Sequence, residues 1–399
     1  MQANAFESLC KTMKKNAIDF VLHGFNSEVD LKDLLLWRRK GEELPESINN
    51  LAYISLSNNE RTVNLTKTQW NPPVIDMSPP LWHELCLPFV NNTIQMRTSS
   101  GCPFSCAFCS YPQLSHGFYT MPVELVEKHI RSVMSLPHIN KIIFLDDTFN
   151  VPVGRFKQLC KMFSKYNFEW FSFLRVQFID EETAALMKTS GCRGVYLGVE
   201  SANDNVLINM NKKATKEQFV RGIELLKKYD IMIMAAFIIG FPGENEKTIS
   251  ENVDFIETSG IDFYTLKEFY YMKNTPVYEK RGEYGLSGLG SKWSHKTMTS
   301  ETAFEYKIMM FREIKNSVFI DPDTSLWYLA YLYDQGFSIN EISDIQKNIN
   351  TLMLEQLDGN FDDNSPRYGE LAEKIRANAN VECSREVDDE STGPKHAED

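Results

Sequence analysis

The residues with the clearest chemical potential lie in one short loop, SSGCPFSCAFCSYP at positions 99–112. It holds three thiols in a C-x3-C-x2-C spacing, on Cys102, Cys106 and Cys109. Buried structural cysteines are common, but three on a Gly/Pro/Ser loop are not a packing pattern. A structural zinc ion takes four ligands, and the sequence has no second C-x2-C pair. A cubane [4Fe–4S] cluster usually receives one thiolate per iron, so three thiolates leave one iron open for chemistry.

The loop stands near the start of a region in which strands and helices alternate. Six apolar, strand-like runs are separated by helix-like segments: TIQMRTS, KIIFLDD, WFSFLRVQ, RGVYLGVES, IMIMAAFIIGFPGE and IDFYTLKEFYYM. This alternation is typical of a parallel βα array. The runs are nearly continuous in apolar residues, as expected where both faces of a sheet are covered. Periodicity alone leaves an open doubly wound sheet and a barrel as alternatives.

The cysteine spacing, with the aromatic Phe108 before the last cysteine, resembles the radical S-adenosylmethionine (radical SAM) superfamily. The resemblance covers roughly residues 93–270, and the position of the loop after the first of six strands fits it. It implies a partial (β/α)6 barrel with a [4Fe–4S] cluster on the three loop cysteines. It further implies S-adenosylmethionine chelated at the open iron, and reductive cleavage to a 5'-deoxyadenosyl radical.

By this resemblance, residues at the ends of the second to fourth strands would contact S-adenosylmethionine. Asp146 and Asp147 stand where the family has a glycine-glycine-glutamate stretch that contacts the amino group; a solvated carboxylate pair is the alternative. Arg175 could pair with the methionyl carboxylate or form a structural salt bridge. Glu200 and Ser201 end the fourth strand, where related enzymes contact the ribose or the amine. Parallel barrels carry their chemistry at this end of the strands.

The fifth strand ends in FIIGFPGE, which resembles the adenine-binding segment of the family. Ile238 would flank the base, and Gly240 and Gly243 would allow the backbone to approach the adenosine. Taken alone, GFPGE would be only a turn.

Residues 1–90 are expected to form a partial α/β unit, before the barrel at 91–285. The barrel segments look most like the subgroup that often carries an N-terminal cobalamin-binding domain, and NAIDFVLHGFNSEVDLKDLL resembles the last strand and helix of such a domain. The cobalt-ligating D-x-H-x-x-G motif is absent, and the segment is short for a five-strand unit, so we predict that no cobalamin binds. His23 is interpreted as an interior histidine rather than a cobalt ligand.

Residues 286–360 are expected to form a mostly helical extension, and the polar residues 361–399 a disordered tail. The tail holds Cys383, the only cysteine after Cys192, which is too few for auxiliary clusters. In peptide epimerases of the superfamily a lone thiol donates hydrogen to the substrate radical, so Cys383 is a candidate catalytic donor. An uninvolved exposed thiol is the alternative.

Composition excludes several classes of protein. The net charge of -12 argues against a general nucleic-acid or anionic-membrane binder. No apolar run is long enough to span a bilayer, and the first residues lack the apolar core of a leader peptide. The remaining cysteines are scattered singly, which indicates a reducing cytoplasm rather than a disulfide framework.

The sequence therefore predicts an α/β radical SAM enzyme that abstracts hydrogen from a peptide or a small natural-product intermediate. An electron donor such as flavodoxin or ferredoxin would be its partner. C-methylation is expected if cobalamin is present, and epimerisation or another cobalamin-free rearrangement is the alternative. A non-enzymatic iron–sulfur carrier is a rival, but a carrier needs no adenosine pocket.

Overall fold

The protein is represented by a computed structural model. It describes residues 9–13, 15, 18–23, 26–41, 45–57, 60–71, 92–115, 117–322 and 325–360, with part of 366–373. Cys86 and Cys383, and most of the predicted tail, lie outside the described residues. In the described part no helix is long and apolar enough to cross a membrane.

The centre of the fold is a sheet of seven strands in the order β15-β11-β10-β9-β8-β7-β4, and every neighbouring pair is parallel. The α/β class and the partial barrel are thus confirmed, with all six predicted strands present. The seventh strand was not predicted, because two residues are too short to show a period. The strands are β4 (Thr93–Met96), β7 (Lys141–Phe144), β8 (Glu169–Leu174), β9 (Cys192–Glu200), β10 (Met232–Ile239), β11 (Phe263–Glu268) and β15 (Val318–Phe319).

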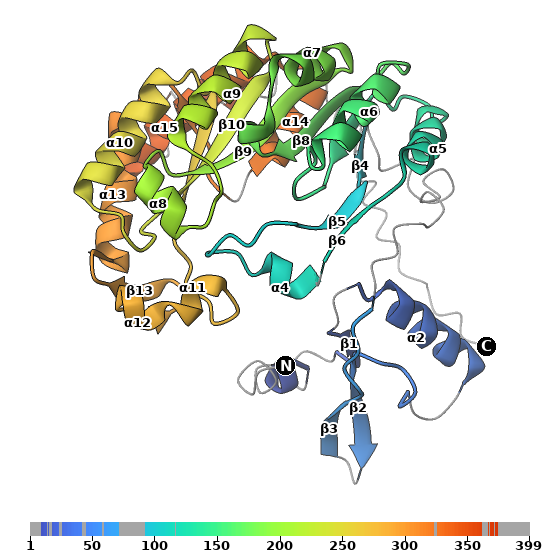
Figure 1. Ribbon diagram of the computed structural model, residues 1–399. Helices are drawn as coiled ribbons and strands as arrows, with labels where there is room; N and C mark the ends of the chain where they lie inside the picture. Colours follow the sequence, from blue (N-terminus) through green and yellow to red (C-terminus); the bar gives the residue numbers. More distant parts are fainter. Residues whose placement is uncertain are drawn as a thin grey trace, which may run out of the picture.

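Amphipathic helices cover the outer face of this sheet (Figure 1). Local signals set where they begin: Asp180 accepts from the backbone N–H of Thr183 at the start of α7, as an aspartate before a helix commonly does. The core beneath them is rich in aromatic rings, and Phe144 stacks on Phe149 with centroids 4.4 Å apart. The outer helices are α5 (Val123–Met134), α6 (Val153–Phe163), α7 (Glu181–Thr189), α9 (Lys216–Lys228), α10 (Glu246–Thr258) and α13 (Ser300–Glu313), and the short α8 (Asp204–Asn209) follows β9.

Two C-terminal helices, α14 (Ser325–Asp334) and α15 (Ile339–Leu357), pack on the inner face of the sheet, behind it in Figure 1. Asp334 forms an ion pair of 3.3 Å with buried Lys141 and accepts from Thr93 Oγ1 at 2.9 Å. Asn350 on α15 donates to the carbonyl of Phe319. The two helices therefore bridge the two edge strands, β4 and β15, at the amino-terminal end of the barrel.

The opposite end of strand β4 is open. Gln95 and Arg97 alternate with Ile94 and Met96, whose side chains belong to the outer core. Gln95 and Arg97 therefore face inward with Thr93, and both are exposed. Among the described residues, the two helices therefore cover the inner face at the amino-terminal end of β4, whereas Gln95 and Arg97 leave it exposed toward the other end of this edge strand.

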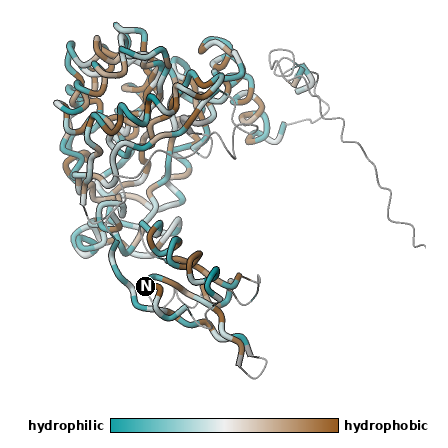
Figure 2. Tube along the Cα trace, turned by 90° about the vertical axis from the view of Figure 1, so that its right-hand side faces the viewer, coloured by the Kyte–Doolittle hydropathy of each residue, from teal (hydrophilic) through white to brown (hydrophobic). Residues whose placement is uncertain are grey.

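The N-terminal unit pairs α2 (Glu28–Lys40) with three strands, β1 (Phe20–Leu22), β2 (Leu51–Ser57) and β3 (Glu60–Leu65). The expected strand and helix are present, followed by a hairpin of β2 and β3, but both strand pairs are antiparallel, unlike those of a doubly wound sheet. Its small core is separate from that of the barrel, and Figures 1 and 2 show it as a separate body. The His23 ring is half-buried, and burial lowers its pKa.

The extension departs from the expected helical content between residues 286 and 300. A three-stranded antiparallel sheet occupies this stretch: β12 (Ser287–Leu289), β13 (Lys292–His295) and β14 (Met298–Thr299). It follows two short helices, α11 (Pro276–Glu279) and α12 (Arg281–Tyr284). Glycines at 288 and 290 take left-handed backbone angles here, which suits hairpin turns rather than a helix.

Candidate radical cofactor site

The cysteine loop is held by a hairpin that sequence reasoning missed. Strand β5 (Ser99–Gly101) pairs antiparallel with β6 (Phe118–Thr120), and the short helix α4 (Tyr111–Ser115) lies between them. Gly101 has a φ of +85°, and a Cβ there would stand 1.9 Å from the carbonyl oxygen of Gly117. Only glycine fits so close a crossing.

Asp146, one of the predicted contacts of S-adenosylmethionine, is fully buried beneath this hairpin. Its carboxylate accepts from the backbone N–H and hydroxyl of Thr98 and from the hydroxyl of Ser99. Burial raises its pKa, and these donors oppose that rise. Arg155 on α6 donates to the carbonyl of Thr98 at 2.9 Å. The structure therefore places Asp146 as an anchor of the cysteine loop on strand β7.

Asp147, the next residue, is exposed at the end of β7 and lies beside Tyr111 of the cysteine loop. Burial, together with the charge of Asp147, raises the pKa of Tyr111 to about 12. Of the two aspartates, Asp147 is the one whose side chain remains open to a ligand.

The three cysteines lie in the loop after β4, and Cys102 and Cys106 are close enough to Cys109 for their charges to add to burial in raising its pKa. Cys106 is buried, while Cys102 and Cys109 are half-buried, and burial raises the pKa of both. Within the described residues, no three His, Cys, Asp or Glu side chains gather as they would around a single metal ion. Three thiols on one short loop are nevertheless the soft donor set that iron–sulfur clusters take.

Arg175 lies directly against this loop. Its Nη2 donates to Cys106 Sγ at 3.3 Å and to the carbonyl of Lys212 at 2.8 Å. Its guanidinium stands 3.7 Å from the ring centroid of Phe104, a cation–π contact. Nη1 is buried with no hydrogen-bond partner among the described residues. An orphaned charged donor beside a cysteine fits a site built for a group that brings acceptor atoms, such as sulfide or a carboxylate.

The side chains of Glu200 and Ser201, at the end of β9, have different neighbours. Glu200, at a φ of +69°, forms a 2.9 Å ion pair with Lys212, and both are buried. Ser201 is also buried, but its hydroxyl contacts Asn252 at 3.4 Å on the side of α10. Glu200 therefore lies on the side of the cavity beside the cysteine loop, and Ser201 lies on the side of α10. Lys212 was missed because no motif surrounds it.

The loop that follows β10, with Gly240 and Gly243, is closed by hydrogen bonds to a glutamate of the same loop. Glu244 is fully buried, and its Oε2 accepts from the backbone N–H groups of Gly240 and Phe241 at 2.6 and 3.1 Å. Burial raises its pKa to about 8, although these donors favour the charged form. The conformation of this loop is thus fixed by hydrogen bonds from its backbone amides to the Glu244 carboxylate.

The C-terminal extension holds the same loop from outside. Trp293 occupies the space in which a Cβ on Gly240 would lie, at 2.4 Å. His295 stacks on Trp293, and its Nε2 is 2.9 Å from the carbonyl of Gly240. Burial lowers the pKa of His295, so the neutral ring donates from Nε2 while Nδ1 faces the N–H of Thr297. The sequence predicts that Gly240 lets the backbone approach adenosine. The structure shows that its missing side chain also leaves room for Trp293.

The remaining predicted residues lie nearby. Gly243 faces the amide of Asn209, which would stand 2.4 Å from an added Cβ. Ile238 lines a cavity of about 280 Å³ between the cysteine loop and strands β9, β10 and β11. Phe108, beside Cys109, and Glu200 line the same cavity. The loop, the Glu200–Lys212 pair and Ile238 are thereby brought to one place.

Gly240→Val is expected to weaken binding of S-adenosylmethionine while iron content stays near wild type. The valine side chain would meet Trp293, and valine rarely adopts the left-handed backbone angle that Gly240 has here (φ +93°), so the loop after β10 must shift. Binding can be measured by equilibrium dialysis and iron by colorimetry, with Gly154→Val, at an α6 position with open space, as the control. Unchanged binding would mean that the adenosine lies elsewhere.

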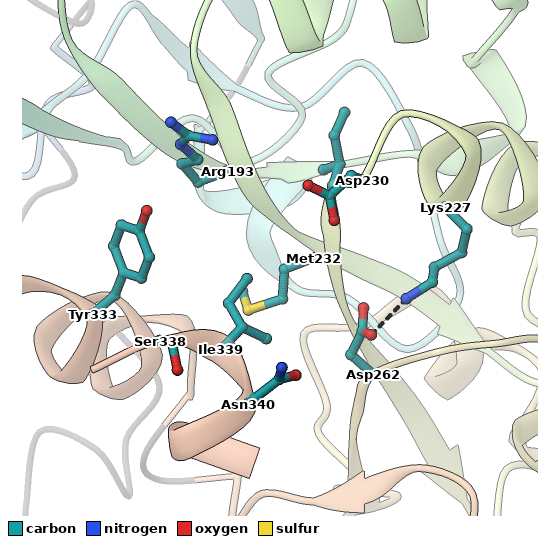
Figure 3. A pocket seen from close by; sticks show the side chains of 10 residues that line it. Arg193, Lys227, Asp230, Met232, Asp262, Tyr333, Ser338, Ile339 and Asn340 are labelled. Carbon is teal, nitrogen blue, oxygen red and sulfur yellow. Dashed lines mark hydrogen bonds and ion pairs between the residues drawn. The ribbon is translucent and has the colours of Figure 1, made fainter. Parts of the chain in front are cut away.

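A second cavity, of about 430 Å³, lies at the opposite end of the barrel strands (Figure 3). Its charged side chains are engaged with one another or with neighbours, as in the 2.6 Å pair of Lys227 and Asp262. Arg193 likewise pairs with Glu169 at 2.7 Å. Barrel chemistry gathers at the carboxyl ends of strands, so this cavity is not the candidate site.

Comparison with known protein families matches residues 96–256 to the Radical SAM superfamily. An uncharacterized methyltransferase of Pyrococcus horikoshii is 32% identical over 171 residues, which are 42% of this chain and 37% of that protein. The bacteriochlorophyllide d C-12(1)-methyltransferase of Chlorobaculum tepidum is 28% identical over 47% of this chain and 42% of its own. The chain spans less than half of the length of these relatives.

Solved structures share the fold. The radical S-adenosylmethionine methyltransferase TsrM from Kitasatospora setae, with tryptophan and a cofactor analogue bound, aligns with a TM-score of 0.52 at 18% identity, covering 69% of this chain and 56% of TsrM. The cobalamin-dependent radical enzyme OxsB aligns with a TM-score of 0.55 at 14% identity, covering 92% of this chain and 60% of OxsB. At these identities the likeness concerns the fold alone.

Proposed function

Because residues 96–256 match the Radical SAM superfamily, we propose that this chain binds a [4Fe–4S] cluster and S-adenosylmethionine and modifies a peptide or natural-product intermediate by hydrogen abstraction. The observation that carries the proposal is the loop of Cys102, Cys106 and Cys109 at the carboxyl ends of the barrel strands, with Arg175 against Cys106. When bound, the cluster supplies the electron that cleaves the sulfonium of S-adenosylmethionine.

In this proposal the cysteines hold the cluster, and Arg175 places positive charge beside it. The orphaned Nη1 of Arg175 is available to an anionic group near the loop. Lys212 holds Glu200 in a fixed orientation through their buried ion pair, so the carboxylate can accept from the ribose or the amine. Asp147 is the second acceptor. Ile238 and Phe108 provide an apolar wall that excludes water from a reactive radical.

The experiment is formation of 5'-deoxyadenosine by reconstituted, dithionite-reduced protein, measured by chromatography. The proposal expects formation, with a flavodoxin or ferredoxin able to replace dithionite. An iron–sulfur electron carrier would form none.

Two reaction subclasses follow from different observations. C-methylation is supported by the names of the relatives, which include methyltransferases. The ribosomal protein uS12 methylthiotransferase of Chlorobium phaeobacteroides, 26% identical over 46% of this chain and 45% of its own, carries the name of a methylthio transfer instead. A cobalamin-free epimerisation or rearrangement is supported by the missing D-x-H-x-x-G motif. In that case Cys383, which lies outside the described residues, is the candidate hydrogen donor.

We predict that the purified protein, reconstituted with iron, sulfide and hydroxocobalamin and then desalted, retains no stoichiometric corrin. The described N-terminal unit offers one long helix and three antiparallel strands, with only three residues in its buried core, and this gives a corrin ring little wall. Absorbance of the desalted protein is the measurement. Stoichiometric corrin absorbance would contradict the prediction and favour C-methylation.

A further inference from the structure

The cavity beside the cysteine loop has one cation that no carboxylate of the described residues neutralises. Glu200 is paired with Lys212, and Glu268 with Lys307 on α13 at 2.8 Å. Lys267, on the inner face of β11 between them, is exposed and forms no ion pair within the described part of the chain. Its ammonium stands 5.9 Å from the ring centroid of Tyr196.

Tyr196 supplies a second, independent observation in the same cavity. The residue is 8% exposed, and its hydroxyl is buried with no hydrogen-bond partner among the described residues. An unsatisfied buried hydroxyl costs stability, so its retention calls for an explanation, and a ligand is one. The other lining residues are mostly apolar: Phe108, Ala236, Ile238, Phe269 and Met272.

We propose that Lys267 and Tyr196 form a carboxylate-binding subsite for the substrate, whose remaining part is apolar. This inference rests on the proposed function for the identity of the reaction centre. S-adenosylmethionine also carries a carboxylate, but Arg175 already provides a buried cation with a free N–H beside Cys106. Lys267 stands three strands away from Arg175 in the sheet order and serves a different anion. Exposed Tyr270 lines the same cavity.

The test uses two isosteric probes, phenylacetate and phenylacetamide, titrated into reconstituted protein saturated with S-adenosylmethionine and followed by ligand-observed NMR. Wild type should bind phenylacetate at least about tenfold more tightly than the amide, as a charged hydrogen bond implies. Lys267→Met should abolish this preference, and Lys267→Arg should keep it. Lys292→Met, which removes an exposed lysine outside the cavity lining, is the matched control.

Tyr196→Phe should change stability and ligand binding in opposite directions. Without ligand it should raise the thermal unfolding midpoint, because an unsatisfied buried hydroxyl is removed. With ligand it should weaken phenylacetate binding about two- to tenfold, as expected for a neutral hydrogen bond. A lowered midpoint together with unchanged binding would remove Tyr196 from the subsite.

Two results would overturn the proposal. Equal affinity of wild type for both probes would show that no carboxylate is recognised. Displacement of phenylacetate when S-adenosylmethionine is added to protein first titrated without it, together with weaker cofactor binding in Lys267→Met, would assign the subsite to the cofactor instead. Formation of 5'-deoxyadenosine by wild type, assayed in parallel, separates failure of this inference from failure of the proposed function.

Discussion

Cys102→Ala is expected to abolish 5'-deoxyadenosine formation, and Cys106→Ala and Cys109→Ala should do the same. In the proposed site each thiol would supply one of three protein ligands, so a variant with two thiolates should hold the cubane poorly. The measurements are product by chromatography, and iron and sulfide content together with the absorbance of the cluster.

Cys10→Ala is the matched control, since it removes a thiol outside the loop. It should keep both the cluster and the activity. Full activity in Cys102→Ala would remove the foundation of the proposed function.

Arg175→Met should lower the rate of 5'-deoxyadenosine formation about 10- to 100-fold, the range expected when a hydrogen bond to a charged group is lost. The guanidinium contacts Cys106 directly and also carries a buried free N–H. Removing its positive charge should also shift the cluster to a more negative reduction potential, because net charge and hydrogen bonds to sulfur set that potential.

Arg175→Lys separates charge from geometry, since lysine keeps the charge and loses the planar fork. The Arg175→Lys variant should keep the cluster reduction potential near that of wild type but should form 5'-deoxyadenosine more slowly. Arg193→Met is the control, because Arg193 pairs with Glu169 at the other end of the barrel. An unchanged potential in Arg175→Met, with slower turnover, would reduce Arg175 to a structural part of the loop.

The features that could be predicted from the sequence are those encoded by neighbouring residues. The cysteine spacing lies within eight positions, and each strand is a continuous apolar run, so both could be recognised without long-range information. Arg175 was singled out for its place at a strand end. Its contact with Cys106 joins residues 69 positions apart, and no local pattern encodes that pairing.

The features that were not predicted depend on contacts between residues that are far apart in the sequence. Trp293 and His295 come from the extension and grip Gly240, which His295 reaches across 55 positions. Lys212 acquires its role only when the turn after α8 brings it against Glu200. Asp146 was singled out because it stands where the family has its glycine-glycine-glutamate stretch; its hydrogen bonds from Thr98 and Ser99 cross 48 and 47 positions, and no local pattern encodes them.

The incomplete closure of the sheet bears on how large a substrate the protein can process. Helices α14 and α15 join the edge strands at one end, while Gln95 and Arg97 remain exposed on the inner face toward the other. A closed barrel admits a molecule only through its mouth, whereas a sheet that leaves β4 and β15 as unpaired edges would let a long chain lie across the rim. The 280 Å³ chamber then limits which bond is reached rather than the mass of the molecule that carries it. A peptide and a short fragment around its reacting residue should accordingly share one turnover number and differ mainly in KM.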